Sequence, residues 1–455
     1  MRISEVFEKQ KKFFLKGETL SESFRKEQLK KLYKGILENE QNIYEAVRKD
    51  LGKSKFECYE TETGIVLEEV SYMLKNLQKL MKPVRVPTPF AHFPARSRIY
   101  REPYGSVLIM APWNYPFQLA IAPLAGCIAA GNCAVLKPSN YSPETSAIIK
   151  SIIEQNFPDE YICVAEGGRE VNHELLDLPF NYIFFTGGIK VGKLVMEKAA
   201  KHLTPVTLEL GGKSPCIVDE TADIPLSAKR IAWGKLLNCG QTCVAPDYVL
   251  AHRDIYDKLI EELKKSIFSL YGSNPHKNIN YPKIINEKHF VRLQNLLENS
   301  CIIAGGESDE KCRKISPALI DADWDCEVMK EEIFGPLLPI IPFDDICEAA
   351  RHINERAKPL ALYLFTKSEK IKKYIVNRVS YGGGCINDTI VHLASSHMPF
   401  GGVGESGMGA YHGKNSFMTF SHQKSVLEKK NWLDMSVRYS PNSESDYKLL
   451  KKLMK

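Results

Sequence analysis

The sequence predicts an α/β fold made of two doubly wound α/β domains and a small bridging arm. Short apolar runs alternate with amphipathic segments between residues 106 and 201, which predicts a parallel sheet covered by helices on both faces. A second alternation begins at Pro215–Val218 and continues through Leu360–Phe365. At 455 residues the chain is also too long for one ordinary hydrophobic core, so we expect two or three domains.

The N-terminal residues 4–80 have the pattern of amphipathic helices. Apolar residues recur there at helical spacing with charged residues between them, for example Leu29, Leu32, Ile36 and Leu37. From Lys82 to Arg101 four prolines interrupt any helix, and Ser97–Arg101 alternates like an edge strand. We therefore expect an arm or linker in this stretch.

The first alternation contains four predicted strands, at Ser106–Met110, Cys133–Lys137, Ile162–Ala165 and Tyr182–Phe185. Helices are predicted at Pro116–Ala130, from Ser142 onward and at Gly188–Lys201. Ser142 followed by Pro143 is typical of an N-cap and a first-turn proline. The uncharged run Pro103–Leu136 is long enough to cross a bilayer, but its prolines and glycines interrupt it. We interpret it as buried core and predict no integral membrane segment.

The composition, with 44% hydrophobic and 25% charged residues, indicates a soluble globular protein. The net charge of +6 comes without a basic block interleaved with aromatics, so nucleic acid is not an expected partner. The N-terminus lacks a signal-peptide pattern and the twelve cysteines lack a framework spacing. We therefore predict a cytoplasmic protein with reduced thiols.

The C-terminal residues 447–455 place four apolar side chains on one helical face against four lysines; the apolar residues are Leu449, Leu450, Leu453 and Met454. This pattern predicts a short helix that docks on the body or on a partner subunit. A helix that lies on a membrane surface is the alternative.

Cys243 is the strongest candidate for chemistry. It lies in the small, polar, turn-prone stretch Asn238–Pro246, whereas a thiol that only fills a core is usually flanked by apolar residues. Upstream, Glu209 ends an apolar run ahead of paired glycines. A nucleophilic thiol and a base that could activate water suggest covalent chemistry on a carbonyl carbon. A metal site from Cys239 and Cys243 lacks a second ligand pair at a plausible spacing, so no metal is predicted.

A nucleotide phosphate site is expected where a strand ends in Gly187 and Gly188 and a helix begins. Such a turn presents free backbone N–H groups and the positive end of the helix dipole to a pyrophosphate. Lys137 ends the strand before, at the sheet edge where nucleotides bind in open α/β folds, although a solvated surface lysine is the alternative. The GxGxxG match at Gly402–Gly407 follows a loop near the C-terminus, so we reject it as a dinucleotide site.

Seven motifs occur together in one order along the chain, and in that order the sequence resembles the NAD(P)-dependent aldehyde dehydrogenase superfamily nearly end to end. They are Pro112-Trp113-Asn114-Tyr115-Pro116, Lys137-Pro138-Ser139, Phe185-Thr186-Gly187, Glu209-Leu210-Gly211-Gly212-Lys213, Gly240-Gln241-Thr242-Cys243, Glu331-Glu332-Ile333-Phe334-Gly335-Pro336 and Pro399-Phe400-Gly401-Gly402-Val403-Gly404. The short N-terminus and the segments Tyr411–Lys414 and Phe420–Gln423 look most like the class 3 branch. That likeness implies a homodimer that acts on aliphatic or aromatic aldehydes.

The resemblance implies a role for each catalytic candidate. Cys243 would be the nucleophile, and the site must either lower its pKa or supply a base. The Asn114 amide and the Cys243 backbone N–H would stabilise the thiohemiacetal oxyanion, one such donor being worth roughly 3 kcal/mol. Glu209 would then activate water to hydrolyse the thioacyl enzyme. The alternative for Asn114 is a turn residue before Pro116.

The resemblance also implies a bound NAD or NADP. Lys137 would contact the adenosine ribose, Glu332 the nicotinamide ribose, and Phe334 and the Leu210 carbonyl the nicotinamide; a helix-cap acid is the alternative for Glu332. The full set of predicted cofactor residues is Trp113, Lys137, Asn140, Gly187, Gly188, Val191, Gly192, Leu210, Glu332 and Phe334.

Two residues depart from the family pattern. Most members carry Glu where this chain has Asn140, and that acid binds the adenosine ribose hydroxyls. Because Asn is neutral, repulsion of a 2′-phosphate is relaxed and use of both NAD and NADP is expected. Gly188 stands where Ser or Asn is common, which removes one polar contact and adds backbone freedom.

We therefore expect an enzyme that oxidises an aldehyde to its carboxylate. Residues 1–82 and 102–210 would form the cofactor-binding domain and residues 211–425 the catalytic domain. Residues 83–101 and 426–455 would form a bridging or oligomerisation arm and a C-terminal tail. The alternatives are a CoA-acylating aldehyde dehydrogenase of the same fold, against which Glu209 argues, and an inactive binding or structural relative.

Overall fold

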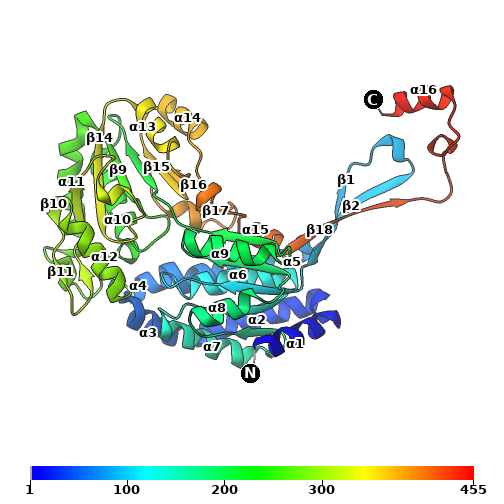
Figure 1. The fold of residues 1–455 in the computed structure, drawn as a ribbon, viewed down its shortest axis with the longest axis horizontal. Coiled ribbons are helices and arrows are strands. Elements are labelled where there is room, and N and C mark those ends of the chain that lie inside the picture. Colours follow the sequence, from blue (N-terminus) through cyan, green and yellow to red (C-terminus); the bar gives the residue numbers. More distant parts are fainter. Residues whose placement is uncertain (1–2, 455) are drawn as a thin grey trace.

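Two open β-sheets flanked by helices make up most of the molecule (Figure 1). The computed structural model describes residues 3–454. The first sheet has six strands in the order β17-β7-β6-β3-β4-β5. Its strands are β3 (Ser106–Met110), β4 (Cys133–Lys137), β5 (Ile162–Val164), β6 (Tyr182–Thr186), β7 (Val206–Glu209) and β17 (Gly407–Met408). They pair in parallel except β17, which pairs antiparallel with β7 in the register Gly407↔Glu209.

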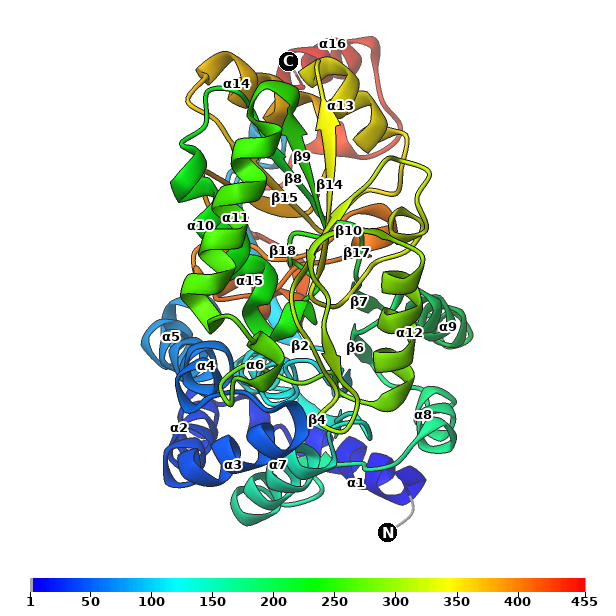
Figure 2. The same ribbon diagram turned by 90° about the vertical axis from the view of Figure 1, so that its left-hand side faces the viewer.

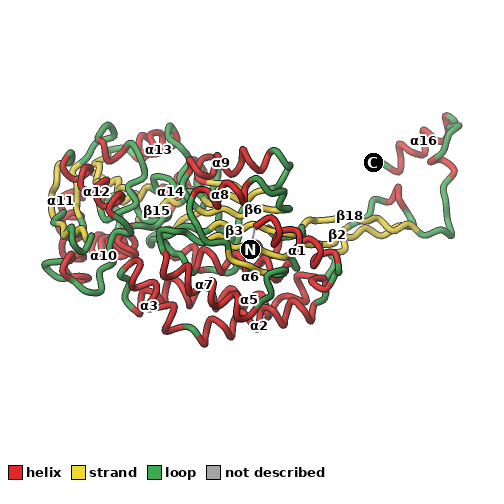
Figure 3. The backbone as a smooth tube through the Cα atoms, turned by 60° about the horizontal axis from the view of Figure 1, so that its bottom comes forward, coloured by secondary structure: helices red, strands yellow, loops and turns green. Residues whose placement is uncertain are grey.

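Helices cover both faces of the first sheet (Figure 3), as the apolar runs of its strands predict. Along β3, Val107 and Ile109 contribute to the core on one face, while Leu108 and Met110 contribute to the core on the other. The first face carries α2 (Glu22–Glu38), α3 (Glu40–Leu51), α5 (Gly64–Met81), α6 (Gln118–Ala130) and α7 (Pro143–Asn156). The second carries α1 (Ile3–Leu15), α8 (Arg169–Leu176) and α9 (Ile189–Ala200).

The second sheet has seven strands in the order β10-β13-β14-β9-β8-β15-β16, all parallel except the edge strand β10. They are β8 (Pro215–Val218), β9 (Tyr248–His252), β10 (Cys301–Gly305), β13 (Ala318–Asp321), β14 (Leu337–Phe343), β15 (Ala361–Phe365) and β16 (Gly383–Ile386). Figure 2 shows α10 (Ile224–Leu236) and α11 (Tyr256–Tyr271) on one side of this sheet, and α12 (Glu287–Glu298) and α13 (Ile346–Asn354) on the other. Beside them lie α14 (Glu369–Arg378) and the hairpin β11 (Ser308–Asp309) and β12 (Lys314–Ile315).

A three-stranded arm projects from the body (Figure 1). It consists of β1 (Val84–Val86), β2 (Ala95–Pro103) and β18 (Ser421–Lys429), and α15 (Lys414–Thr419) precedes β18. The chain ends beyond the arm in α16 (Glu444–Leu453), of which no residue is buried. No helix within residues 3–454 is both long enough and apolar enough to cross a membrane. The α/β fold with two open sheets and an arm agrees with the sequence prediction.

Two local expectations were wrong. Ser97–Arg101 was expected at a sheet edge, but β2 is the central strand of the arm because β18, more than 300 residues later, pairs along its free side. Ser142 precedes α7 without capping it, since its hydroxyl donates to the Ser139 carbonyl at 3.3 Å. Asp50 caps this helix instead and accepts hydrogen bonds from the Glu144 and Thr145 N–H groups at 3.3 and 2.8 Å.

Candidate active site

Cys243 lies where two cavities meet. One, of about 170 Å³, is lined mainly by apolar side chains, and the other, of about 340 Å³, is lined by glycines and by charged and polar groups. Cys243 and Leu119 line both cavities. The thiol can therefore be approached from two directions by molecules of different character.

The apolar cavity is enclosed by parts of several helices and by the loops that follow the second sheet in the sequence, from residue 390 to residue 412. Its lining comprises Glu60, Thr61, Ile65, Tyr115, Gln118, Leu119, Trp233, Leu237, Thr242, Cys243, Val244, Ile390, Val391, Leu393, Ala394, Phe400, Tyr411 and His412. Glu60 and Thr61 come from a π-helical turn, Tyr59–Thr63, between α4 (Lys55–Cys58) and α5, and such turns are frequent at functional sites. The predominance of apolar side chains suits the hydrocarbon part of a substrate.

The second cavity brings together nine of the thirteen predicted site residues. These are Trp113, Asn114, Gly187, Gly188, Glu209, Leu210, Cys243, Glu332 and Phe334. They come from five of the seven motifs, which lie far apart in the sequence. Lys137, Asn140, Val191 and Gly192 do not line this cavity.

The four remaining residues lie on the same sheet edge or on α9. Lys137 ends β4, is buried, and its Nζ donates to the Pro138 carbonyl at 2.7 Å. Burial lowers the pKa of Lys137 to about 8, against the opposing charge of Glu166. Asn140 is exposed, and a Cβ on Gly168 would lie 3.8 Å from its Nδ2.

The loop that carries Cys243 has an unusual backbone. After α10 ends at Leu236, three successive residues have left-handed φ angles: 52° at Asn238, 56° at Cys239 and 73° at Gly240. A Cβ on Gly240 would lie 2.2 Å from the Gly335 carbonyl oxygen, so this position admits only glycine. Strained backbone of this kind persists only where the surroundings hold it.

The Cys243 thiol is only partly accessible and Cys239 is fully buried. Burial, followed by the charges of Glu332 and Glu209, raises the pKa of Cys243 to about 12, while the Cys243 and Val244 backbone N–H groups oppose that rise. The surroundings of the thiol within the described residues therefore disfavour the thiolate. Cys239 instead donates from Sγ to the Tyr281 hydroxyl at 3.2 Å, which makes it part of the core.

Glu209 ends β7 with its carboxylate buried. Neither of its side-chain oxygens has a hydrogen-bond partner within the described residues. Burial raises the pKa of Glu209 well above its usual range. A carboxyl group in this state can take up a proton readily, which is the property a general base needs near neutral pH.

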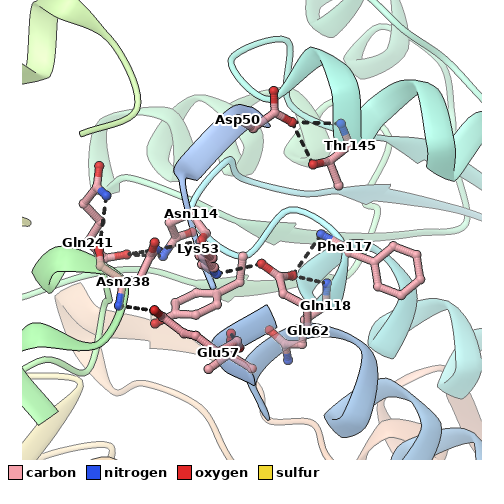
Figure 4. A network of polar contacts seen from close by, with 12 residues as sticks. Asp50, Lys53, Glu57, Glu62, Asn114, Phe117, Gln118, Thr145, Asn238 and Gln241 are labelled. Atoms are coloured by element: carbon pink, nitrogen blue, oxygen red, sulfur yellow. Dashed lines mark hydrogen bonds and ion pairs between the residues drawn. The ribbon is translucent and has the colours of Figure 1, made fainter. Parts of the chain in front are cut away.

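Asn114 is buried and belongs to a polar network that reaches into the Cys243 loop (Figure 4). Its Nδ2 donates to the Gln241 carbonyl at 3.0 Å. Its own carbonyl accepts from Asn238 Nδ2 at 2.7 Å and from Lys53 Nζ at 3.2 Å. These contacts hold the Asn114 amide against the segment just before Cys243.

The second cavity is also lined by Glu332, Phe334 and Trp113. Burial and the charge of Asp247 raise the pKa of Glu332 to about 8. A Cβ on Gly211 would lie 2.1 Å from Glu332 Oε2, so a glycine is required for this carboxylate to sit there. Phe334 adopts a left-handed φ of 49° and packs edge-to-face on Trp113 with ring centroids 5.3 Å apart.

The phosphate loop joins β6 to α9. No side chain caps the N-terminus of α9, and a Cβ on Gly188 would meet nothing within 4 Å. The Thr186 hydroxyl, also in the cavity wall, is buried and has no hydrogen-bond partner among residues 3–454. Unpaired donors beside open space at a helix N-terminus fit the pyrophosphate of a nucleotide cofactor. Within residues 3–454, no cluster of three or more His, Cys, Asp or Glu side chains could hold a metal ion.

Comparison with known proteins gives the family directly. A profile described as "Aldehyde dehydrogenase family" matches residues 2–426. The chain belongs to the aldehyde dehydrogenase family. This aldehyde dehydrogenase is 50% identical over 442 residues to 4,4'-diaponeurosporen-aldehyde dehydrogenase of Staphylococcus aureus, covering 96% of each chain. It is 46% identical over 435 residues to aldehyde dehydrogenase family 3 member A2 of Pongo abelii, covering 95% of this chain and 90% of the relative.

Solved structures give the same result. A structure described as the substrate-bound state of AldH from Staphylococcus aureus superposes with a TM-score of 0.98 at 48% identity over 100% of each chain. The GapN glyceraldehyde-3-phosphate dehydrogenase of Methanocaldococcus jannaschii, solved with NADP, superposes with a TM-score of 0.84 at 25% identity over 94% of each chain. The predicted resemblance to class 3 aldehyde dehydrogenases is confirmed. The comparisons also support the prediction that the protein is an enzyme that oxidises an aldehyde.

Several residues in this site were not predicted from the sequence. Glu57, Glu62 and Lys53 were included in a set of amphipathic helices, yet all three are buried beside Asn114 and the Cys243 loop. The sequence feature that could have indicated their burial is the mixture of charged and apolar residues between positions 53 and 67. Tyr115 belongs to one of the seven motifs, but no role was predicted for it. Its hydroxyl lies 2.5 Å from Thr242 Oγ1.

Proposed function

We propose that this aldehyde dehydrogenase oxidises an aldehyde to its carboxylate with NAD or NADP, through a covalent intermediate on Cys243. The observation that carries the proposal is the position of Cys243 at the junction of the two cavities. The apolar cavity would hold the aldehyde, and the cavity with the phosphate loop would hold the nucleotide. Glu209 and Asn114 line the cavity with the phosphate loop, which Cys243 also lines.

The first step is addition of sulfur to the carbonyl carbon. The Cys243 thiol loses its proton to solvent, and the sulfur forms a bond to the carbonyl carbon. The carbonyl π electrons move to oxygen and give a thiohemiacetal oxyanion. The Asn114 Nδ2 and the Cys243 backbone N–H would donate to that oxyanion, and one such donor contributes roughly 3 kcal/mol. Asn114 Nδ2 has a second hydrogen available besides the one donated to Gln241.

The second step leaves a thioacyl group on Cys243 as the oxyanion electrons reform the carbonyl. The carbon must lose a hydride in this step, and hydride acceptance is the chemistry that a nicotinamide held by Trp113, Leu210 and Phe334 would supply. Glu209 then takes a proton from water, the resulting hydroxide adds to the thioacyl carbon, and the carbon–sulfur bond breaks. The carboxylic acid and the Cys243 thiolate are released. Burial of Glu209 without a hydrogen-bond partner keeps it basic enough for this role.

The described residues fit a nicotinamide nucleotide. Gly187, Gly188, Val191 and Gly192 would surround the pyrophosphate at the N-terminus of α9, and the orphaned Thr186 hydroxyl lies there as well. Lys137 would contact the adenosine ribose and Glu332 the nicotinamide ribose, while Trp113, Leu210 and Phe334 would surround the nicotinamide. The neutral Asn140 supports use of both NAD and NADP.

The alternative in which CoA releases the acyl group remains the main rival within the family. A buried, unpartnered Glu209 favours water, because a base beside the thioester would hydrolyse it before CoA could react. An inactive relative is disfavoured by the joint presence of Cys243, Glu209 and Asn114 at one cavity.

The arm supports a homodimer. It projects from the body, and its tip carries stacked aromatic side chains: Phe90 and Phe93 have centroids 5.9 Å apart, and Trp432 contacts Phe93 at 6.1 Å. Phe90 and Trp432 are each 70% exposed. We propose that a second copy covers this surface and that residues 83–101 and 426–455 form the bridging arm and tail. All twelve cysteines are free thiols, which suits a reducing compartment such as the cytoplasm.

The test is a panel of aliphatic and aromatic aldehydes assayed with NAD and with NADP, with and without CoA. Formation of the carboxylate and of reduced nucleotide in the absence of CoA supports the proposal. A strict requirement for CoA, or no turnover of any aldehyde, would contradict it.

A further inference from the structure

Lys53 is a fully buried cation, at 0% exposure, inside the body of the enzyme. Its Nζ donates to Glu62 Oε1 at 2.7 Å and to the Asn114 carbonyl at 3.2 Å. The same ammonium lies 3.8 Å from the centroid of the Tyr115 ring. Removing two charges from water is costly, and a buried pair is often no better for stability than apolar residues of the same size. Stability alone therefore gives a weak reason for this pair.

Glu62 connects Lys53 to the beginning of α6. Its second oxygen, Oε2, accepts hydrogen bonds from the Phe117 and Gln118 N–H groups at 3.2 and 2.9 Å (Figure 4). The residue before α6, Phe117, provides no side-chain cap of its own. Lys53 and Glu62 together thus bind both ends of the segment 114–118, which contains Asn114 and Tyr115.

Glu57, in α4 and four residues after Lys53, binds the other partner of Asn114. Its Oε1 accepts from the Asn238 N–H at 2.6 Å, at the first left-handed residue of the Cys243 loop. Asn238 Nδ2 in turn donates to the Asn114 carbonyl at 2.7 Å and to the Gln241 carbonyl at 3.1 Å. Figure 4 shows these groups converging between the two loops.

The Asn114 carbonyl therefore accepts two hydrogen bonds, from Lys53 and Asn238, while its side-chain Nδ2 donates to the Gln241 carbonyl. Rotation of this peptide would break both contacts to the carbonyl, and the Asn114 backbone, which carries the side-chain amide, would no longer be held against the Cys243 loop. A charged donor restricts that rotation more strongly than a neutral one.

We propose that Lys53, held by Glu62, is a positioning residue that fixes the side-chain amide of Asn114 where the oxyanion forms. The inference rests on the proposed function, in which Asn114 stabilises that oxyanion. Lys53 does not touch the reacting atoms, and it acts through the Asn114 carbonyl. Glu57 also helps to position Asn114, because it binds the Asn238 N–H in the Cys243 loop and Asn238 binds the Asn114 carbonyl.

The first variant is Lys53→Met, with Lys26→Met as its matched control. Lys26 pairs with Glu22 at 2.6 Å on the surface of α2, with its side chain 40% exposed. Lys53→Met should lower kcat/KM for aldehyde by on the order of 10²-fold, the scale of a misplacement of about 1 Å. The Kd for NAD should stay within about twofold, since Lys53 lies outside the nucleotide cavity. Lys26→Met should change neither quantity.

Because Lys53→Met leaves Glu62 buried and unpaired, a second variant separates folding from positioning. Lys53→Met with Glu62→Gln removes both charges, while the amide oxygen of Gln can still accept from the Phe117 and Gln118 N–H groups. We expect this double variant to recover the wild-type Tm and to keep the low kcat/KM. Recovery of kcat/KM along with Tm would overturn the proposal.

A double-mutant cycle with Asn114→Ala gives the decisive readout. Asn114→Ala keeps the backbone carbonyl that Lys53 binds but removes the amide that Lys53 would position. In that background Lys53→Met should cost less than about threefold in kcat/KM, so the two losses should be strongly non-additive. Additive losses would overturn the inference and leave the function of Asn114 intact. An Asn114→Ala variant with wild-type activity would refute the oxyanion role itself, and the inference with it.

Discussion

The Nδ2 of Asn114 donates a 3.0 Å hydrogen bond to the carbonyl of Gln241, two residues before Cys243, the proposed nucleophile. The two residues are 127 positions apart in the sequence, on loops that follow β3 and α10. This contact joins the wall of the nucleotide cavity to the loop of the thiol. It places the amide proposed to bind the oxyanion in direct contact with the segment on which that oxyanion forms.

Replacing the nucleophile should abolish turnover without affecting the nucleotide. Cys243→Ser should reduce dehydrogenase activity to background, because a serine hydroxyl is far less nucleophilic at this site, while the Kd for NAD stays near the wild-type value. The measurement pairs steady-state rates with nucleotide binding by fluorescence titration. Cys239→Ser is the matched control, since its sulfur faces Tyr281 in the core. An active Cys243→Ser enzyme together with an inactive Cys239→Ser enzyme would show that the wrong thiol was chosen.

The rate should rise with pH in a way that depends on Glu209. Burial raises the pKa of this carboxyl, so at low pH it is protonated and cannot take a proton from water. As the pH increases through that pKa, kcat should increase and then level off. Glu209→Gln should be slow at every pH and should lack this rise. An unchanged pH profile in the Gln variant would assign the titration to another group.

Cofactor choice should depend on Asn140. Unit charges about 4 Å apart interact by roughly 4 kcal/mol at a typical protein-surface dielectric, so a neutral residue here removes repulsion of a 2′-phosphate. We expect measurable activity with both NAD and NADP, and Asn140→Glu should shift the kcat/KM ratio toward NAD by about one to three orders of magnitude. Because Asn140 is exposed, Asn140→Glu should fold normally, and a change in the ratio then reports on cofactor binding. Wild type without NADP activity, or an unchanged ratio in the Glu variant, would contradict this explanation.

Two glycines in glycine-rich motifs should behave in opposite ways. Gly188→Ala adds a Cβ to open space beside the phosphate loop, so Tm should hold while the Kd for nucleotide increases. Gly407 has a φ of 144°, and a Cβ there would lie 2.2 Å from the Leu208 carbonyl oxygen. Gly407→Ala should therefore destabilise the fold by about 1–3 kcal/mol, measured by thermal unfolding. If Gly188→Ala lowered Tm as much as Gly407→Ala did, the phosphate loop would be a structural element.

The strands and their carboxyl ends were predictable from the sequence because apolar runs and paired glycines are local signals. The structure places Lys137 and Glu209 at the ends of β4 and β7, and Gly187 directly after the end of β6. Contacts between distant segments carry no local signal. The capping of α7 by Asp50 spans 94 residues, and the Lys53–Asn114 bond spans 61. Lysine is normally a surface residue, so the burial of Lys53, in the loop between α3 and α4, follows only from packing that no periodicity records.

The sequence also contains no indication that the chain returns to the first sheet near residue 407. β17 has only two residues, too few for an alternation pattern, yet it pairs with β7 at Glu209. Gly402 and Gly407 of this motif are required by close backbone contacts, since a Cβ there would lie 2.1 Å from the Ser406 carbonyl oxygen and 2.2 Å from the Leu208 carbonyl oxygen. The GxGxxG match therefore has a structural reason, and its residues do not line the cavity proposed for the nucleotide.

The central claim, a thioacyl enzyme on Cys243 that Glu209 hydrolyses, is tested most directly by trapping that intermediate. Glu209→Gln should be mixed with aldehyde and NAD, quenched in acid, and analysed by intact and peptide mass spectrometry. The account predicts a burst of about one NADH per active site and the mass of one acyl group on the peptide that contains Cys243. A burst without an adduct, an adduct on another cysteine, or full turnover in the Gln variant would contradict it.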